Sequence, residues 1–298
     1  MPSPEELARY YPASYYGNES KKFVPVIELL SRTVRKILRS FFLKRFSGHR
    51  AFLEIGCGRG DLLAELAKMG WECHGTEYGS SPSMSNKHLG KCVIHNKQNL
   101  RDANFSDNYF DMVVIRHVLE HLPNPEETIQ EISRILKPGG GLYLVVPNYD
   151  GYVSSLFGSH WFALDVPRHL FHFTPQCLSI LLNKYSLRIK KQSFLSFEQD
   201  VFTFAQSAQN YMGFTYNGLY DLIRNDSARL SSKAAISQSE KWLILVTGAI
   251  LSVAGFFISL FSAIFRTGGV IEIYAVRDRK DNMKACRPLA SYLSHLSD

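Results

Sequence analysis

FLEIGCGRGDLLAEL, at residues 52–66, contains three glycines closely spaced between two apolar patterns. The residues before Gly56 are mostly apolar, and the residues after Gly60 repeat apolar side chains at helical spacing. This order predicts a strand, a tight turn and a helix. Glycine allows the backbone of such a turn to pass close to a ligand, and the start of the next helix offers unpaired N–H groups. The helical repeat consists of Leu62, Leu63, Leu66 and Met69.

The spacing of the glycines distinguishes between two kinds of nucleotide-binding site. A dinucleotide site uses G-x-G-x-x-G, but the third glycine position is Asp61 here, and its carboxylate would repel a pyrophosphate. Counted from Glu54 to Gly60, the pattern is E-x-G-x-G-x-G, which suits a ligand with a zwitterionic end such as S-adenosylmethionine. An NAD-dependent oxidoreductase or epimerase is the alternative, and a purely structural turn is a third reading.

Composition narrows the class of protein. The chain has 298 residues, 45% of them hydrophobic, which is enough for one large domain or a domain with an elaboration. The net charge of +7 would allow contact with nucleic acid or an anionic membrane, yet the basic residues are dispersed, and we expect no nucleic-acid partner. Five cysteines without a C-x-x-C pair favour a reducing compartment, and the N-terminus does not resemble a signal peptide. We expect a cytoplasmic protein.

Alternating strand and helix patterns follow the glycine turn. Strands are predicted over 71–77, 91–95, 109–115 and 141–147, and a helix lies between the last two. This alternation predicts a mostly parallel sheet covered on both faces. Glu77 ends the second strand, where a carboxylate can accept hydrogen bonds from ribose hydroxyls.

Two longer stretches resemble one family. LEIGCGRGDLLAELAKMGWECHGTEYG (53–79) and FDMVVIRHVLEHLPNPEETIQEISRILKPGGGLYLVVPN (110–148) resemble the class I S-adenosylmethionine-dependent methyltransferases of the ubiquinone-biosynthesis-like kind, over about residues 48–196. The resemblance implies a Rossmann-like α/β fold with a seven-stranded sheet, whose last strands, 186–194 and 268–277, form an antiparallel pair. It also implies a cofactor site formed by Glu54, Gly56, Gly58, Gly60, Glu77, Tyr78, Asn99, Leu100 and His117.

Most of these cofactor residues have an implied place. The glycines approach the methionine moiety, Glu77 binds the ribose and Tyr78 lies against the adenine. Asn99 stands where the family usually has an aspartate that contacts the adenine amine, and His117 lies beside the cofactor.

Histidines are the candidate catalytic residues. Methyl transfer from a sulfonium aligns a nucleophile with the methyl group and removes its proton, and an imidazole does this near neutral pH. His121 and His169 are the candidate general bases; alternatively, His121 hydrogen-bonds the backbone and shapes the pocket. We expect no metal, because no cysteine joins the histidines and the displacement needs no Lewis acid.

WFALDVPRHLFHFT (161–174) should cross the mouth of this site and supply substrate contacts. It is similar to a motif in a subgroup of these enzymes, many of which occur among genes for cell-surface glycan assembly. Arg168 could hold an anionic group of the substrate through two hydrogen bonds. The expected substrate-binding residues are Trp161, Arg168 and His172.

Residues 242–265 form an apolar segment of 24 residues without a charge, long enough to cross a bilayer as a helix. A single crossing would separate the two antiparallel strands that flank it. A monotopic insertion that docks on a membrane, a buried helical subdomain and a true span are the three interpretations. Residues 201–239 would belong to the same insertion, with 201–223 as a substrate-facing helix. Small residues recur along the segment at Gly248, Ser252, Gly255, Ser259 and Ser262, which predicts close approach of another helix.

Together these patterns predict four parts: an N-terminal helical lid (1–47), a cofactor-binding core (48–196), a helical apolar insertion (197–268) and a last strand with a C-terminal tail (269–298). The predicted function is methyl transfer to an oxygen of a small-molecule, lipid-linked or glycan acceptor, with membrane contact through 242–265 at the inner face of a membrane. The alternative is a non-catalytic module that only binds the cofactor.

Overall fold

The computed structural model describes residues 10, 50–77, 92–97, 99–223 and 236–279. The lid predicted over 1–47 (apart from Tyr10) and the predicted adenine contact Tyr78 lie outside the described residues.

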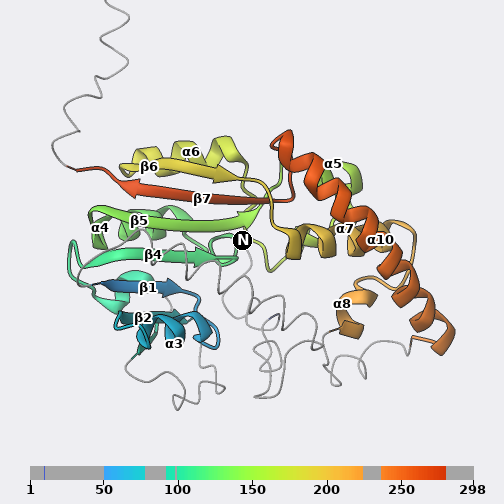
Figure 1. Cartoon of the computed structure of the whole chain (residues 1–298), viewed down its shortest axis with the longest axis horizontal. Helices are drawn as coiled ribbons and strands as arrows, with labels where there is room; N and C mark the ends of the chain where they lie inside the picture. The colour runs from blue at the N-terminus through green and yellow to red at the C-terminus, as the bar shows by residue number, and fades with distance from the viewer. Residues whose placement is uncertain (1–9, 11–49, 78–91, 98, 224–235, 280–298) are drawn as a thin grey trace, which may run out of the picture.

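A seven-stranded sheet forms the centre of the molecule, in the order β3-β2-β1-β4-β5-β7-β6 (Figure 1). The first five strands in the chain are parallel, and β7 runs antiparallel to both of its neighbours. This confirms the Rossmann-like fold and the antiparallel pair predicted from the sequence. The strands are β1 (Ala51–Ile55), β2 (Glu72–Glu77), β3 (Val93–Asn96), β4 (Phe110–Arg116), β5 (Leu136–Pro147), β6 (Leu187–Ser193) and β7 (Val270–Arg277).

Helices cover both faces of the sheet, as the runs of apolar residues in the strands require. On one face α4 (Pro125–Ile135) and α6 (Pro175–Lys184) share an apolar core with alternate residues of β1 and β4 and with residues of β5, β6 and β7, and α6 lies against β6. On the other face α3 (Asp61–Ala67) packs against the residues in between, such as Phe52 and Met112. The sheet core therefore holds the carboxyl ends of β1, β2 and β4 at one edge, where the glycine turn begins.

The chain between β6 and β7 makes a separate helical layer beyond the end of the sheet (Figure 1). It contains α7 (Phe197–Tyr211), α8 (Gly218–Ile223) and α10 (Gln238–Ile264). The single helix predicted over 201–223 is wrong, because Gly213 adopts a left-handed φ of 84° and ends the regular helix between α7 and α8.

The small residues of α10 lie on the face that packs against α7. Gly248, Gly255, Ser259 and Ser262 are buried. A Cβ atom on Gly255 would lie 3.1 Å from the carbonyl oxygen of Val201 in α7, so the two backbones are in close contact. The small-residue pattern thus allows the close approach that the sequence predicted.

Three shorter helical segments lie between β5 and α6. They are α5 (Tyr152–Phe157), η5 (Gly158–His160) and η6 (Phe162–Leu164). Two further 3-10 turns, η3 (Leu100–Ala103) and η4 (Leu119–His121), follow β3 and β4 at the edge that carries the site.

Candidate cofactor and methyl-transfer site

The glycine turn after β1 is held in left-handed backbone conformations. Gly56, Gly58 and Gly60 have φ values of 68°, 53° and 69°. The N–H of Gly56 donates to the carbonyl of Thr76 at 2.9 Å, and the N–H of Gly58 donates to a carboxylate oxygen of Glu77 at 2.7 Å. The glycines and the acidic end of β2, which the sequence placed in one site, are therefore in direct contact.

The space around the turn differs from one glycine to the next. A Cβ on Gly58 would meet no atom of the described residues within 4 Å, so among them this part of the backbone is open to a ligand. A Cβ on Gly56 would lie 2.2 Å from Cγ2 of Val118, which follows β4. The turn is thus pressed against the start of the VLEH segment (118–121), and a ligand on the turn would lie next to that segment.

A buried carboxylate lies at the centre of the segment after β4. Glu120 is 1% exposed, and its Oε1 lies 3.6 Å from Nδ1 of His117. His117 itself has a left-handed φ of 53°, which is uncommon for a residue other than glycine and frequent at functional sites. Sequence reasoning missed Glu120, although it stands in the quoted motif between two predicted site residues.

His121 and His169 meet beside this carboxylate. Their ring centroids are 4.6 Å apart. One ring nitrogen of each histidine and a carboxylate oxygen of Glu120 all lie within 4.8 Å of one another. His121 directs Nδ1 at the carbonyl of Arg168 (3.0 Å), and His169 directs Nδ1 at the carbonyl of Ala163 (2.7 Å). A carbonyl accepts only from an N–H, so these bonds place the proton on Nδ1 and the lone pair on Nε2 in both neutral rings.

Comparison with known proteins assigns the family. A family model described as a methyltransferase domain matches residues 27–192, which is more than half of the chain. The chain belongs to the class I S-adenosylmethionine-dependent methyltransferases.

Relatives and structural neighbours of this methyltransferase agree on the fold. A ubiquinone biosynthesis O-methyltransferase of Shewanella halifaxensis is 24% identical over 74% of the chain and 89% of that protein. Phosphoethanolamine N-methyltransferase 2 of Haemonchus contortus, in complex with S-adenosylhomocysteine, has a TM-score of 0.56 at 15% identity, covering 94% of this chain and 61% of that one. The [4+2]-cyclase SpnF has a TM-score of 0.50 at 17% identity, covering 81% and 80%.

S-adenosylmethionine is the cofactor of this methyltransferase. The residues at the glycine turn fit it, because Gly58 leaves open space above the backbone and Glu77 places a buried carboxylate at the strand end. A carboxylate has about four acceptor sites, so Glu77 can accept hydrogen bonds from ribose hydroxyls while it also accepts from the N–H of Gly58. Glu54 lies in β1, paired in register with Gly75 of β2 and Val114 of β4. Its predicted role in cofactor binding stays a prediction.

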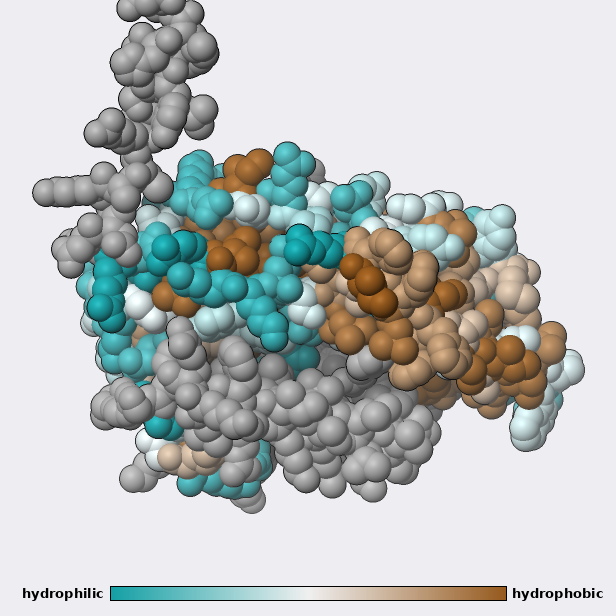
Figure 2. All heavy atoms as spheres, turned by 45° about the horizontal axis from the view of Figure 1, so that its top comes forward, coloured by the Kyte–Doolittle hydropathy of each residue, from teal (hydrophilic) through white to brown (hydrophobic). Residues whose placement is uncertain are grey.

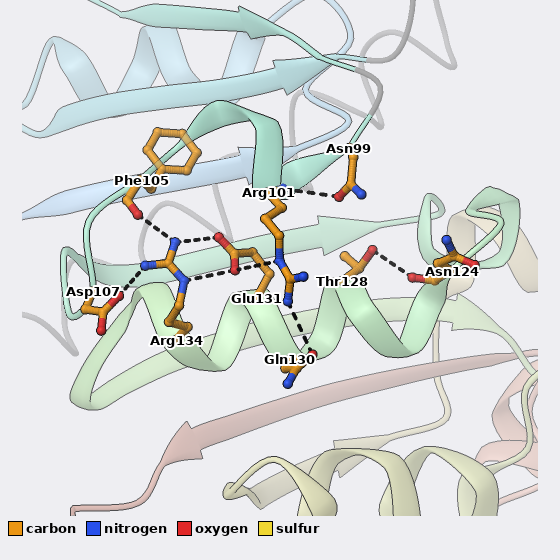
Figure 3. A network of polar contacts seen from close by, with 9 residues as sticks. All are labelled: Asn99, Arg101, Phe105, Asp107, Asn124, Thr128, Gln130, Glu131 and Arg134. Carbon is orange, nitrogen blue, oxygen red and sulfur yellow. Dashed lines mark hydrogen bonds and ion pairs between the residues drawn. The ribbon is translucent and has the colours of Figure 1, made fainter.

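The predicted adenine side of the site is fixed by a polar network (Figure 3). Asn99 caps η3, where its side-chain oxygen accepts from the N–H of Arg101 at 3.1 Å. Arg101 and Arg134 both approach the buried carboxylate of Glu131 in α4. Leu100 is 2% exposed, and its side chain packs in the core of the sheet. Contacts of Asn99 and Leu100 with adenine stay predictions.

The three predicted substrate residues differ in position. Trp161 is 1% exposed and packs inside the helical layer, so its ring supports the site from within and offers no accessible surface. Arg168 pairs with Asp165 through Nε and one terminal nitrogen, and its predicted contact with an anionic substrate group stays a prediction. His172 bonds the carbonyl of Leu164 through Nε2 at 3.0 Å and lies 6.2 Å from the ring of His169.

Further polar groups, which the sequence did not single out, lie on β5, β7 and α7. The hydroxyl of Tyr143 donates to Glu272 at 3.1 Å. Burial raises the pKa of Glu272, although Tyr143 and Arg116 oppose the shift, and burial raises the pKa of Asp200 to about 7. No periodic pattern in the sequence distinguishes such residues from ordinary strand positions.

Burial and neighbouring charge act in opposite directions within the histidine cluster. Burial lowers the pKa of His169 to about 4, despite the nearby charge of Glu120. Burial of Glu120 would raise its carboxyl pKa, but the nearby His117 and the charge of His121 leave that pKa below its ordinary value. His169 is therefore neutral and Glu120 ionised near neutral pH.

The shifted pKa of His169 predicts a loss of stability in mild acid. Between pH 6.5 and about 4 the unfolded chain binds a proton at His169 that the folded chain does not, so stability falls as pH decreases through this window. The shift corresponds to about 3 kcal/mol at its limit. Urea unfolding at pH 7.5 and pH 5 should show a smaller acid loss in His169→Gln than in the wild type, and an equal loss in both proteins would contradict the assignment.

The same three donors could hold a metal ion. Glu120, His121 and His169 offer one carboxylate and two imidazole nitrogens, a set that suits several divalent cations. The sequence predicted no metal here. Metal binding is therefore the alternative to proton transfer as the role of this cluster, and treatment with a chelator distinguishes the two.

Proposed function

We propose that this methyltransferase transfers the methyl group of S-adenosylmethionine to a hydroxyl oxygen of a small-molecule, lipid-linked or glycan acceptor, with His121 as the general base. One observation carries the proposal: the glycine turn touches Val118, and Glu120 and His121 follow two and three residues later. A methyl donor held on the turn would therefore lie beside an imidazole that is backed by a buried carboxylate.

His121 suits the role of base better than His169. A general base works best when its pKa is near the operating pH, and burial lowers the pKa of His169 to about 4, which makes it a weak proton acceptor. The Nδ1 bond of His121 to the Arg168 carbonyl orients the ring, with the lone pair on Nε2. The charge of Glu120 stabilises the imidazolium that forms once the proton has been taken, as the third member of a triad does.

The printed activities of relatives favour oxygen as the acceptor atom without deciding it. The Shewanella halifaxensis relative is named an O-methyltransferase, and the chain covers 89% of it. The solved structures with the same fold include an N-methyltransferase and a cyclase, so the fold by itself does not choose the acceptor atom. Oxygen is favoured by the O-methyltransferase relative and by a base beside the cofactor turn.

The function can be tested with purified protein, carbon-13-methyl S-adenosylmethionine and a lysate that includes membranes. We expect a labelled product whose methyl carbon has the chemical shift of a methoxy group. A shift typical of N-methyl or C-methyl would overturn O-methylation. Cofactor binding without any labelled product would favour the non-catalytic alternative, and retained NAD would favour the oxidoreductase.

His121→Gln tests the base in the same assay. We expect turnover to fall about 100- to 10,000-fold while the Kd for S-adenosylmethionine stays within about twofold, because a base acts on the acceptor in the transition state. His160→Gln is the matched control, since His160 lies in η5 against Tyr211 and outside the cluster. Treatment with a chelator should leave wild-type activity intact. If activity is lost and a divalent cation restores it, the cluster is a metal site and His121 is not the base.

A further inference from the structure

α10 exposes large apolar side chains along its whole length. Twelve of them between residues 242 and 265 are 37–76% exposed, and only 22% of its most apolar window is buried. Figure 2 shows the resulting apolar area over this helix. The twelve are Trp242, Leu243, Leu245, Val246, Ile250, Val253, Phe256, Phe257, Leu260, Phe261, Ile264 and Phe265. The helix is therefore not enclosed, as the buried-subdomain interpretation would require, and monomeric soluble proteins seldom expose an apolar surface of this extent.

The polar groups of α10 are satisfied inside the helix. Thr247 donates to the carbonyl of Leu243 at 2.6 Å, and Ser252 donates to the carbonyl of Gly248 at 2.7 Å. Ser259 does the same with Gly255 on the buried face. Residues 242–265 carry no charge. The exposed face thus needs no hydrogen bonds from its partner, which is what hydrocarbon offers.

The ends of the helix are basic. Lys241 precedes the apolar run and Arg266 follows it. The nearby carboxylate of Glu240 accepts from the N–H and hydroxyl of Thr215, so it is turned toward the protein. If a second copy covered the face, parallel or antiparallel pairing of two α10 helices would bring these positive ends together. Anionic lipid headgroups complement both ends at once.

The surroundings of α10 favour an orientation along a membrane surface. α7 lies beside it, with Gln209 donating to the carbonyl of Ile244 and Val201 next to Gly255. At its C-terminal end α10 leads through Gly268 directly into the sheet. A helix that crossed the bilayer would draw the polar residues of α7 into hydrocarbon, whereas a helix in the plane of the surface leaves them on the aqueous side.

We propose that α10 docks this protein on a phospholipid bilayer that contains anionic lipids, with the helix parallel to the surface and its exposed face in the boundary between headgroups and acyl chains. Docking does not depend on methyl transfer. Combined with the proposed function, it indicates that the acceptor is lipid-linked and is methylated at the membrane. The test is therefore a binding measurement, so that its failure is distinct from a failure of the proposed activity.

Flotation of the full chain with vesicles tests the surface. We expect the protein to float with vesicles of phosphatidylcholine and phosphatidylglycerol, and less with phosphatidylcholine alone. The double variant Phe257→Glu/Phe261→Glu should reduce the bound fraction at least tenfold. Both side chains are over 60% exposed, so the fold tolerates the change. Ile180→Glu is the matched control, since Ile180 is 65% exposed in α6 on the sheet domain, and we expect it to bind as the wild type does.

Several outcomes would overturn the proposal. Wild-type protein that stays with the soluble fraction at all lipid compositions would do so, as would a double variant that still floats. A dimer in solution that the double variant makes monomeric, without vesicle binding by either, would assign the face to a second copy.

A fluorophore placed at Leu243→Cys, Val253→Cys or Ile264→Cys, in a chain whose exposed cysteines are serine, would test the orientation through quenching by lipids labelled at known depths. Equal shallow depths are expected for a helix lying along the surface. A deep central position with shallow ends would show a transmembrane helix.

Discussion

Gly56→Ala is expected to weaken binding of S-adenosylmethionine by about 100-fold or more, which corresponds to about 2.7 kcal/mol. Two costs add at this residue. The φ of 68° costs an alanine about 1 kcal/mol, and the new Cβ would lie 2.2 Å from Cγ2 of Val118, well inside contact distance. Val118 is β-branched and stiff at χ1, so the turn must move, and the backbone surface that would hold the cofactor moves with it. Isothermal titration calorimetry with the purified variant measures the change.

Two companion variants separate the steric effect from backbone strain. Gly70→Ala has a similar strain, with φ 83° and no atom within 4 Å of the new Cβ, but it lies after α3 and away from the turn, so cofactor binding should stay as in the wild type. Gly56→Ala combined with Val118→Ala removes the two Cγ atoms and should recover part of the lost affinity. Equal affinities of Gly56→Ala and wild type would show that the turn does not hold the cofactor.

The sheet was predictable from the sequence because its information is local. Strand and helix periods and the glycine turn each determine their own segment. The strand pairing then follows from the short connections and from the antiparallel pair that the family resemblance implied. The same local signals fail at Gly213, where an apolar pattern continues across the break between α7 and α8.

The site was predictable only in part, because its chemistry depends on contacts between distant segments. The sequence indicated His121 and His169, but their ring contact and the burial of Glu120 beside them depend on residues 161–174 folding back over η4. Trp161 shows the reverse: an aromatic residue in a motif suggested a substrate contact, and the packing of α7 against it leaves the ring buried. Arg168 likewise pairs with Asp165, three residues before it, a contact that no sequence pattern indicated.

Glu120→Gln is expected to lower kcat about 100- to 1,000-fold while the Kd for S-adenosylmethionine changes little. The amide keeps the size of the side chain but removes the charge next to His117, His121 and His169, so an imidazolium formed during methyl transfer is no longer stabilised. The folded state favours the ionised form of Glu120, since its pKa is lowered on folding. The variant should therefore also lose stability at neutral pH, and the stability difference should vanish as the pH falls through the carboxyl pKa.

The pH dependence of the rate distinguishes this electrostatic role from a structural one. If Glu120 stabilises the protonated base, the acidic limb of the kcat/KM profile moves to lower pH in Glu120→Gln, because protonation of the free base becomes less favourable. A structural role would lower the rate at all pH values without moving the limb. Glu120→Asp keeps the charge one methylene farther away and should restore part of the rate and the position of the limb. A Glu120→Gln enzyme with wild-type kcat would contradict the assignment, since a buried carboxylate beside three histidines would then have no part in the transfer.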